Sequence, residues 1–443
     1  MILIIGGGPA GRLGAMRLAR AGRDVLLVER KKIGGQCLHH GCMMVCALND
    51  VARVIRSCEE LQDLGIMRGS PELSFPVLLR EMGKAQYRIE QVLEEETRQA
   101  GVEILYGKEG RCSGSALSID GERVSADAGI IATGSRPNVP PIPGISTRGV
   151  FTPHTLPAME KLPQRMVIMG GGVMAAEFAY IFSAFGSEVT ILCRSGFLRT
   201  LDPYLRDLAQ KELPGVTIRE QVEVEQVDRT GSSLILTCLE GEERITLESE
   251  ALLIAAGLVP NGECAEGVKK GPEGEIVVDD HLRTSAPGIY ACGDVTGPPY
   301  FTPVARMEGI VAADNILGRD RVMDYQFIPQ AIALRHDIAF CGSLRGHVAT
   351  VTAPGPAGPG SFWSVPTAAT GSCRVAIDPE TGSLAGVALA VPGGALIATY
   401  LAAMLHQGTR VQDLERLIEV HPSTDGVLPL LRYLAEWRER QKG

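Results

Sequence analysis

The chain lacks an excess of positive charge. Its 43 Lys and Arg residues are outnumbered by 52 Asp and Glu residues, so the formal net charge is -9. A protein of this sign repels a polyphosphate backbone, and we therefore expect no nucleic acid partner. Its 443 residues exceed what one hydrophobic core usually organises, which predicts two to four domains with room to bury a large cofactor.

A targeting signal and an uninterrupted membrane span are also missing. The run from Met1 to Gly6 has neither the basic flank nor the long apolar stretch of a signal peptide, so we expect a cytoplasmic protein whose thiols are mostly reduced. The segment from Leu384 to Leu405 is uncharged and long enough to cross a bilayer, but Pro392 and two glycines interrupt it. We therefore expect a buried strand at 385–391, a helix at 395–405 and no membrane association.

The cysteines do not follow the pattern of a structural disulfide framework. They number 11, an odd count, and are scattered over a long chain, so a closely spaced pair is a catalytic or metal candidate. Cys37 and Cys42 form such a pair. At the start of a helix their sulfurs can close a small ring, and the helix N-terminus lowers the thiol pKa. His39 and His40 lie beside them, but no second short-spaced ligand pair supports a zinc site, so we expect no metal.

Two units about 165 residues apart each open with an apolar strand that runs into glycines and then into a helix. In the first unit, residues 2–5 lead to Gly6-Gly7-Gly8-Pro9-Ala10-Gly11. Gly6 permits a tight turn, Gly8 lets a pyrophosphate approach the backbone, and Gly11 lets helix and strand pack closely. The helix N-terminus offers free amides to phosphates. A second strand at 24–28 ends at Glu29, whose carboxylate can accept ribose hydroxyls.

The second unit has the same order of elements but a different ending. Gly170 and Gly172 follow a strand at 166–169, with Ala175 at the third glycine position. After the next strand, at 188–192, Arg194 stands where an acid is expected, and Arg199 follows at short range. Guanidiniums can bind a 2′-phosphate that a carboxylate repels, so this site favours NADPH over NADH. The alternative is that both arginines are solvated surface charge.

Together with these motifs, three further segments make the chain resemble the pyridine nucleotide-disulfide oxidoreductases, in the group that contains dihydrolipoamide dehydrogenase, glutathione reductase and mercuric reductase. The segments are Ala132-Thr133-Gly134-Ser135-Arg136-Pro137, Ala255-Ala256-Gly257 and Ile289-Tyr290-Ala291-Cys292-Gly293-Asp294. The similarity continues from Ile328-Pro329 to His421-Pro422-Ser423. It implies FAD bound by Gly6, Gly8, Gly11, Glu29, Gly35, Gly134 and Asp294, and NAD(P) bound by Gly170, Gly172, Arg194, Arg199 and Gly257.

The resemblance also implies a route for electrons from NADPH through the flavin to the disulfide. Cys42 would face the flavin, and Cys37 would exchange with the substrate through a mixed disulfide. His421 would come from the partner subunit as the acid or base, so that a homodimer completes each site. Alternatively, His421 only caps the last helix. Glu177 would lie beside the reacting flavin nitrogen.

Two positions depart from the family pattern. The family usually has a proline and then a lysine three or four positions after the second cysteine, whereas this chain has Met43-Met44-Val45-Cys46. Because that lysine normally pairs with the acid at Glu177, we expect a less stabilised reduced flavin or a different charge partner. Cys46 is either a relay thiol or a small buried apolar residue. The family also has a glutamate where this chain has Gly426, so Asp425 becomes the candidate that orients the imidazole.

We predict an α/β fold class with two Rossmann-like (FAD and NAD(P)) domains plus a C-terminal α+β dimerisation domain. The expected bounds are 1–145 and 259–320 for the FAD domain, 146–258 for the NAD(P) domain and 321–443 for dimerisation. The expected enzyme resembles dihydrolipoamide dehydrogenase and acts on a small dithiol or a lipoyl-bearing protein. Two alternatives stay open. One is a metal-ion reductase similar to mercuric reductase, although residues 438–443 contain no cysteines to hand over a soft metal. The other is a flavoprotein that passes electrons to a protein partner.

Overall fold

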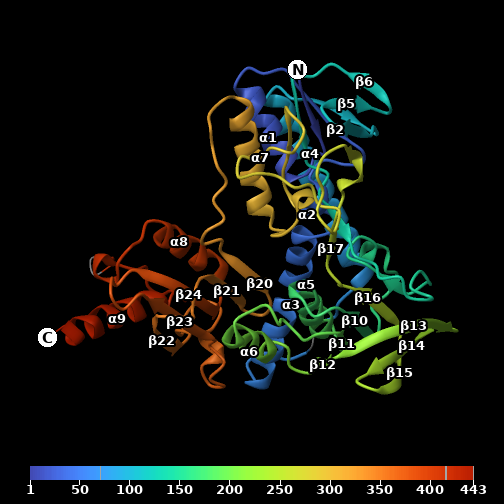
Figure 1. Ribbon diagram of the computed structural model, residues 1–443. Coiled ribbons are helices and arrows are strands. Elements are labelled where there is room, and N and C mark those ends of the chain that lie inside the picture. The colour runs from blue at the N-terminus through green and yellow to red at the C-terminus, as the bar shows by residue number, and fades with distance from the viewer. Residues whose placement is uncertain (70, 415–416, 443) are drawn as a thin grey trace.

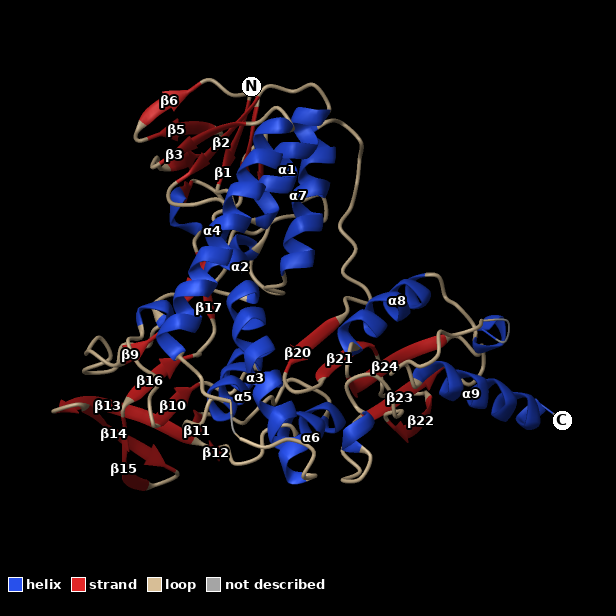
Figure 2. Ribbon diagram, turned by 180° about the vertical axis from the view of Figure 1, so that it is seen from behind, coloured by secondary structure: helices blue, strands red, loops and turns tan. Residues whose placement is uncertain are grey.

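Three groups of strands, each with its own helices, make up the molecule (Figure 1; Figure 2). The computed structural model describes residues 1–69, 71–414 and 417–442. Two groups are built around parallel five-stranded sheets and the third around an antiparallel sheet, so the predicted α/β class with two Rossmann-like parts is confirmed. Within the described residues, no helix is both long enough and apolar enough to cross a membrane.

The N-terminal sheet has the parallel strand order β19-β7-β1-β2-β3. Its central strand is apolar throughout because both faces are covered: Ile2 and Ile4 face helices α1 and α7, whereas Leu3 and Ile5 face a small second sheet. Since β19 comes after the whole second part of the chain, this part is discontinuous in sequence. The elements are β1 Ile2–Ile5, α1 Pro9–Arg20, β2 Val25–Glu29, α4 Phe75–Gln99, β3 Glu103–Tyr106, β7 Ala128–Ile131, β19 Ile289–Ala291 and α7 Thr302–Ile316, with the small sheet β4 Gly110–Ser113, β5 Ala116–Ile119, β6 Glu122–Val124 and β18 Ala265–Glu266.

The second sheet has the order β12-β11-β10-β16-β9, with β10 parallel to both β11 and β16. A three-stranded antiparallel sheet, β13-β14-β15, packs beside it, and the pair β8-β17 connects it to the first part. The elements are β8 Ser135–Pro137, β9 Val150–Phe151, β10 Arg165–Met169, α5 Val173–Ala184, β11 Glu188–Cys193, α6 Pro203–Lys211, β12 Thr217–Glu220, β13 Val222–Thr230, β14 Ser233–Glu240, β15 Glu243–Ser249, β16 Ala251–Ile254 and β17 Leu258–Pro260.

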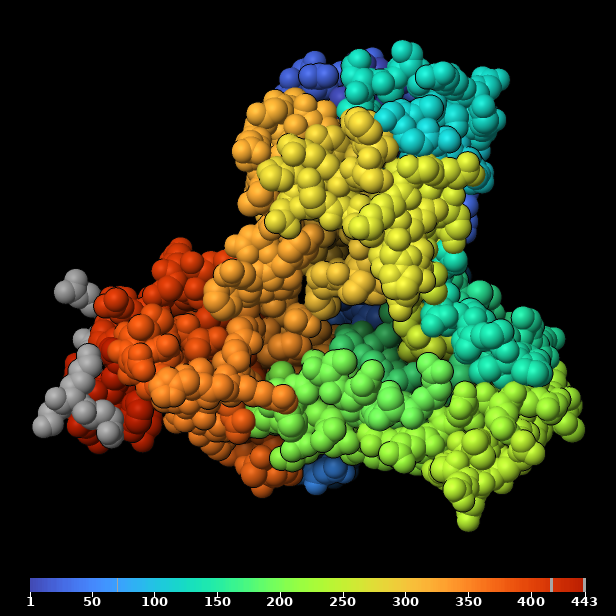
Figure 3. Space-filling view, viewed as in Figure 1, coloured from blue at the N-terminus to red at the C-terminus, as the bar shows by residue number. Residues whose placement is uncertain are grey.

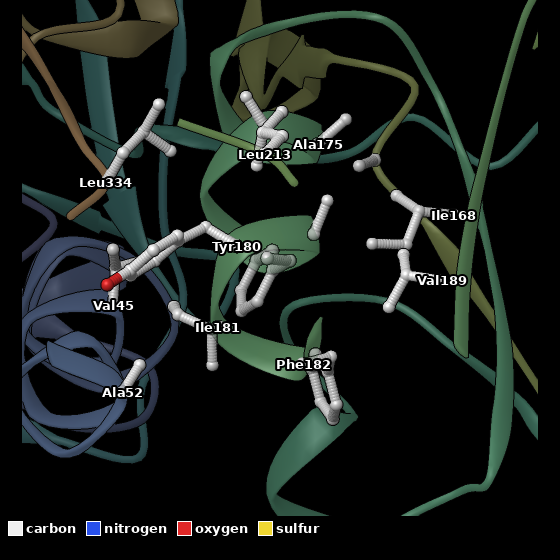
Figure 4. Close-up of a cluster of buried hydrophobic side chains, with 14 of the residues drawn as sticks. Val45, Ala52, Ile168, Ala175, Tyr180, Ile181, Phe182, Val189, Leu213 and Leu334 are labelled. Carbon is white, nitrogen blue, oxygen red and sulfur yellow. The ribbon is translucent and has the colours of Figure 1, made fainter. Parts of the chain in front are cut away.

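Helix α3 (Cys42–Asp63) ties the first part to the second, and it follows the short helix α2 (Gly35–His39). Its buried face packs against α5, eight of whose 12 residues are buried. Figure 4 shows Val45 and Ala52 of α3 beside Tyr180 and Ile181 of α5. The start of α3, which carries Cys42, is therefore held by a core that contains residues of both nucleotide-type units.

The C-terminal part is an antiparallel sheet of order β20-β21-β24-β23-β22 covered by two helices. The predicted strand and helix on either side of Pro392 are confirmed as β24 and α8. The break follows from Gly393, whose φ of 73° begins the helix in the left-handed region. The elements are β20 Gln330–Ala333, β21 Asp337–Gly342, β22 Ala349–Pro354, β23 Ser372–Ile377, β24 Leu384–Val391, α8 Gly394–His406 and α9 Val427–Lys442.

Candidate active site

A cavity of about 440 Å³ lies where α1, α3 and α5 approach one another, and we call it the dithiol cavity. Figure 3 shows the surface hollowed in the region between the upper and lower parts of the molecule. The side chains and turns of all three parts contribute to its lining. The cavity is lined by nine of the site residues predicted from the sequence: Gly6, Gly8, Glu29, Gly35, Cys37, Cys42, Gly134, Glu177 and Asp294. Cys46, Tyr300, Thr302 and Ala333 also line it.

The glycine turn after β1 forms a cradle that only glycine permits. Gly6 has a φ of 106°, and a Cβ there would overlap the carbonyl oxygen of Ala132. A Cβ on Gly11 would overlap the carbonyl oxygen of Gly6, so this glycine allows α1 to lie close against β1. Around Gly8, at the start of α1, the nearest atom to an added Cβ is 3.9 Å away. A ligand backbone can therefore approach the free amides at the start of α1 closely.

Two carboxylates lie on either side of this cradle. Glu29 accepts hydrogen bonds from the backbone amides of Gly7 and Lys31, each at 2.7 Å, and its carboxylate is held at the cavity wall. Asp294 accepts a hydrogen bond from the Ser135 hydroxyl at 2.6 Å, and burial raises the pKa of its carboxyl group. A dinucleotide with ribose and ribityl hydroxyls would find an acceptor at each end of the cradle.

Cys37 and Cys42 lie next to each other, on α2 and on the first turn of α3, and both are thiols here. A hydrogen bond from the Cys37 thiol is the main reason that the pKa of Cys42 falls to about 6, and the Thr302 hydroxyl, 3.5 Å from the Cys42 sulfur, lowers it further. The same hydrogen bond, together with burial, raises the pKa of Cys37. Near neutral pH the pair therefore holds one proton on Cys37 and a thiolate on Cys42.

Glu177 and Cys46 face the dithiol cavity from opposite helices. The Glu177 carboxylate accepts one hydrogen bond, from the Ala333 amide at 3.0 Å, and burial raises the pKa of Glu177 to about 7. Cys46 is exposed, so it is not the small buried apolar residue of the second expectation, and partial desolvation raises the pKa of its thiol. The guanidinium of Arg53 lies on the same helix as Cys46, but Asp337 binds it at 2.7 Å. Because residue 46 is a cysteine and not a lysine, it offers no positive charge to the Glu177 carboxylate.

A second cavity, of about 710 Å³, lies at the carboxyl ends of β10, β11 and β16, and we call it the nucleotide cavity. Gly170, with a φ of 140°, turns the chain from β10 towards α5, and a Cβ there would overlap the Ala255 carbonyl oxygen. Gly172 precedes the N-terminus of α5, and Gly257 lines the opposite wall. Arg194, Ser195, Arg199 and Thr200 are exposed and line the far end. Ligands of parallel α/β sheets bind at the carboxyl ends of the strands, which is where this cavity lies.

A comparison with protein families matches residues 1–309 to the family described as pyridine nucleotide-disulphide oxidoreductase. The chain belongs to this family. The oxidoreductases of the family are FAD-dependent and use NAD(P)H, and the glycine cradle, the two carboxylates and the nucleotide cavity fit those two cofactors.

Individual relatives of this oxidoreductase carry different activities. This chain is 28% identical over 450 residues to a dihydrolipoyl dehydrogenase of Bacillus subtilis (strain 168), and the match covers 96% of each chain. It is 33% identical over 360 residues to a mercuric reductase of Streptomyces lividans, covering 77% of this chain and 75% of the relative. Among solved structures, the HOCl-induced flavoprotein disulfide reductase RclA from Escherichia coli superposes with a TM-score of 0.86 at 25% identity, covering 98% of this chain and 99% of that one.

His421 is not among the residues that line the dithiol cavity of its own chain. His421 is exposed in the segment before α9, in the C-terminal part of the molecule (Figure 1). Asp425 accepts hydrogen bonds from the Tyr400 hydroxyl and, at 2.9 Å, from the Val427 amide at the start of α9. Both of its oxygens are thus engaged by the fold of the C-terminal part. That Asp425 orients the imidazole of His421 stays a prediction.

Sequence reasoning did not find Tyr300, in the loop before α7, or Thr302, the first residue of α7, and both line the dithiol cavity. These residues are more than two hundred positions from the cysteines, and no motif spacing marks them. His39 ends α2, and its ring Nε2 lies 2.9 Å from the Ile33 carbonyl oxygen. The centroid of the His40 ring lies 4.3 Å from that of His154, and burial lowers the pKa of His40 to about 4. Among the described residues, no group of three or more His, Cys, Asp or Glu side chains could hold a metal ion.

Proposed function

We propose that this protein is a disulfide oxidoreductase similar to dihydrolipoamide dehydrogenase, which passes electrons between NADPH, or less readily NADH, and a dithiol or disulfide substrate. The single observation that carries the proposal is that Cys37 and Cys42 line the same cavity as the glycine cradle and Asp294. The substrate is small or carried on a lipoyl-bearing protein. In this proposal the enzyme works as a homodimer in the cytoplasm, with domains bounded as the sequence predicts.

FAD held by the glycine cradle, Glu29 and Asp294 would supply two-electron chemistry between the nicotinamide nucleotide and the Cys37–Cys42 pair. The cysteines carry out the exchange. Cys37 loses its proton to His421 of the partner subunit and attacks one sulfur of the substrate disulfide, and the released substrate thiolate takes that proton. The Cys42 thiolate then attacks the Cys37 sulfur. The second substrate thiolate leaves, takes a proton from solvent, and the Cys37–Cys42 disulfide re-forms.

Preference for NADPH rests on the far end of the nucleotide cavity. Arg194 and Arg199 line it together with the hydroxyl-bearing Ser195 and Thr200, and no acid occupies the end of β11. A 2′-phosphate can be bound by both guanidiniums and by the hydroxyls. An arginine pair that only served as surface charge would not need to face a cavity.

A second candidate function, reduction of a soft metal ion, is favoured by Cys46. The thiols of Cys37, Cys42 and Cys46 line one cavity without forming a three-ligand metal site among the described residues, and a single thiolate there can bind a soft metal ion as a substrate. Mercuric reductases are among the relatives, and RclA has also been solved as a Cu(II) complex.

Anaerobic titration of the flavin-loaded enzyme with NADPH and then with NADH tests the proposal. We expect two electrons per flavin and a red-shifted thiolate–flavin absorption band that is lost in Cys42→Ser but kept in Cys37→Ser. Simple bleaching of the flavin in the wild type would contradict a coupled dithiol. Turnover with dihydrolipoamide supports the first function, whereas NADPH oxidation that depends on Hg²⁺ and falls in Cys46→Ser supports the second.

A further inference from the structure

The dithiol cavity and the nucleotide cavity share three residues of their walls. Met174 comes from α5, Leu258 from β17, and Tyr300 from the loop before α7. Hydride transfer requires the donor and acceptor rings to lie roughly 3–3.5 Å apart. A nicotinamide ring in the nucleotide cavity can therefore meet a ring in the dithiol cavity only at this shared wall.

Tyr300 differs from the other two residues because its side chain carries a hydroxyl group. The hydroxyl oxygen is buried and has no hydrogen-bond partner among the described residues. Buried tyrosine hydroxyls nearly always find a partner, and because Tyr300 also lines both cavities, its unpaired hydroxyl points to a group that binds there. Met174 and Leu258 can offer a polar ligand only apolar contact or a weak sulfur acceptor.

The surroundings of Tyr300 keep its hydroxyl group protonated, so that it can donate a hydrogen bond. Burial, together with the nearby carboxylates of Glu273, Asp294 and Glu275, raises the pKa of Tyr300. The phenol is therefore protonated at neutral pH. A donor at this wall suits an amide oxygen, which is the polar group that a nicotinamide ring carries.

We propose that Tyr300 is the positioning residue for the nicotinamide ring: its hydroxyl donates a hydrogen bond to the carboxamide of the bound nucleotide, and its ring closes the passage between the two cavities when no nucleotide is bound. The inference rests on the proposed function, because it requires a nicotinamide nucleotide in the nucleotide cavity. In this proposal the glycines and arginines hold the phosphates of the nucleotide, and Tyr300 aligns its nicotinamide ring.

The first test compares two ligands on the flavin-loaded enzyme by calorimetry. NADP⁺ carries the nicotinamide, and 2′-phospho-ADP-ribose lacks it. Tyr300→Phe keeps the ring and removes the hydroxyl, so its dissociation constant for NADP⁺ should rise about 3- to 10-fold while that for 2′-phospho-ADP-ribose stays unchanged. Tyr106→Phe is the matched control, because Tyr106 also has a buried hydroxyl without a partner among the described residues but lines neither cavity.

Equal affinities of Tyr300→Phe and wild type for NADP⁺ overturn the inference, as does an equal loss for both ligands. A wild-type enzyme that binds neither ligand instead overturns the proposed function. If NADH proves to be the preferred donor, NAD⁺ and ADP-ribose replace the two probes.

The second test removes the ring. In Tyr300→Ala the open passage should let oxygen reach the reduced flavin, so the reoxidation rate in air should rise several-fold over wild type, whereas Tyr300→Phe should match wild type. A rate in Tyr300→Ala equal to that of wild type overturns the closing role. Flavin content and melting temperature, measured on the same samples, separate this effect from a loss of folding, and the Tyr300→Phe result stands even where Tyr300→Ala is unstable.

Discussion

At the scale of single residues, Cys46 and Glu177 distinguish this enzyme from the family pattern. The first occupies the position at which the family usually has a lysine, and the second keeps its carboxylate in the same cavity with one backbone hydrogen bond. Arg53 is bound to Asp337 and does not replace the missing cation. Among the residues that the structure describes, no base forms an ion pair with this acid at the edge of the cavity.

Restoring the cation should raise the flavin potential. In Cys46→Lys the ammonium group can pair with Glu177 and stabilise the reduced flavin, so we expect the midpoint potential to rise by about 20–40 mV, which corresponds to roughly 1–2 kcal/mol for two electrons. Spectroelectrochemical titration measures the shift. Cys46→Met, which has similar length and no charge, is the control, and equal potentials for the two variants would show that charge at this position is unimportant.

Glu177 should also make the stability of the protein depend on pH. Burial raises the pKa of Glu177 to about 7, above its ordinary value of 4.5. Between these values the folded protein keeps a proton that the unfolded chain has lost, so this contribution to the free energy of unfolding falls as the pH rises towards 7. Relative to wild type, Glu177→Gln should gain about 2 kcal/mol between pH 5 and pH 8.

Urea unfolding of the flavin-free protein at pH 5 and pH 8 measures this difference. The exposed Glu72 provides the control, since Glu72→Gln should leave the pH dependence of the wild type unchanged. A Glu177→Gln variant whose stability follows that of the wild type at both pH values would mean that Glu177 is not protonated in the folded state.

At the scale of elements, the contact between β1 and α1 depends on Gly11. A methyl group there would overlap the Gly6 carbonyl oxygen, so Gly11→Ala must move α1 away from the strand and disturb the cradle. We expect the free energy of unfolding to fall by about 1–3 kcal/mol and the purified protein to contain less flavin. Absorbance at visible wavelengths and urea unfolding measure the two effects.

Gly83, in the interior of α4, is the control for this substitution. A Cβ added there meets no atom within 4 Å, and the backbone is helical. Gly83→Ala should therefore stabilise the protein by about 0.5–1 kcal/mol and leave the flavin content unchanged. If both variants behave alike, the loss at Gly11 does not come from the overlap.

The strands and helices with motif signals were predicted close to their observed bounds, and those without such signals were not. Apolar runs ending in glycine predicted β1 and β10, and Pro392 predicted the end of β24. No element was predicted for the β13–β15 sheet, although Leu234, Leu236 and Cys238 alternate with less buried residues along β14. An alternating strand gives no indication of which neighbour it pairs with, and this sheet contributes no known binding motif.

At the scale of the whole molecule, the exposed His421 and the cysteine pair belong to different parts of one chain. If His421 of the partner subunit completes each site, then Cys37→Ser and His421→Ala are each inactive alone but complement one another. Co-expression in equal amounts should produce mixed dimers in half of the population, each with one intact site, and should restore about a quarter of wild-type activity. Separately purified variants, mixed without subunit exchange, serve as the baseline.

Activity that stays at this baseline after co-expression would place the acid or base within a single chain.

The candidate site could be predicted from the sequence where a local motif holds its residues together, as at Cys37 and Cys42. It could not be predicted where the wall between two cavities is assembled from distant segments, as with Thr302 and Tyr300.

The return of β19 to the N-terminal sheet has a consequence for biogenesis. During synthesis on the ribosome, β7 lacks its neighbour β19 while β10, β11 and β16 emerge and pair with one another. The second part can therefore complete its sheet inside an unfinished first part. Asp294 comes shortly after β19, so the nascent chain acquires that wall of the dithiol cavity only after the inserted second part has been synthesised.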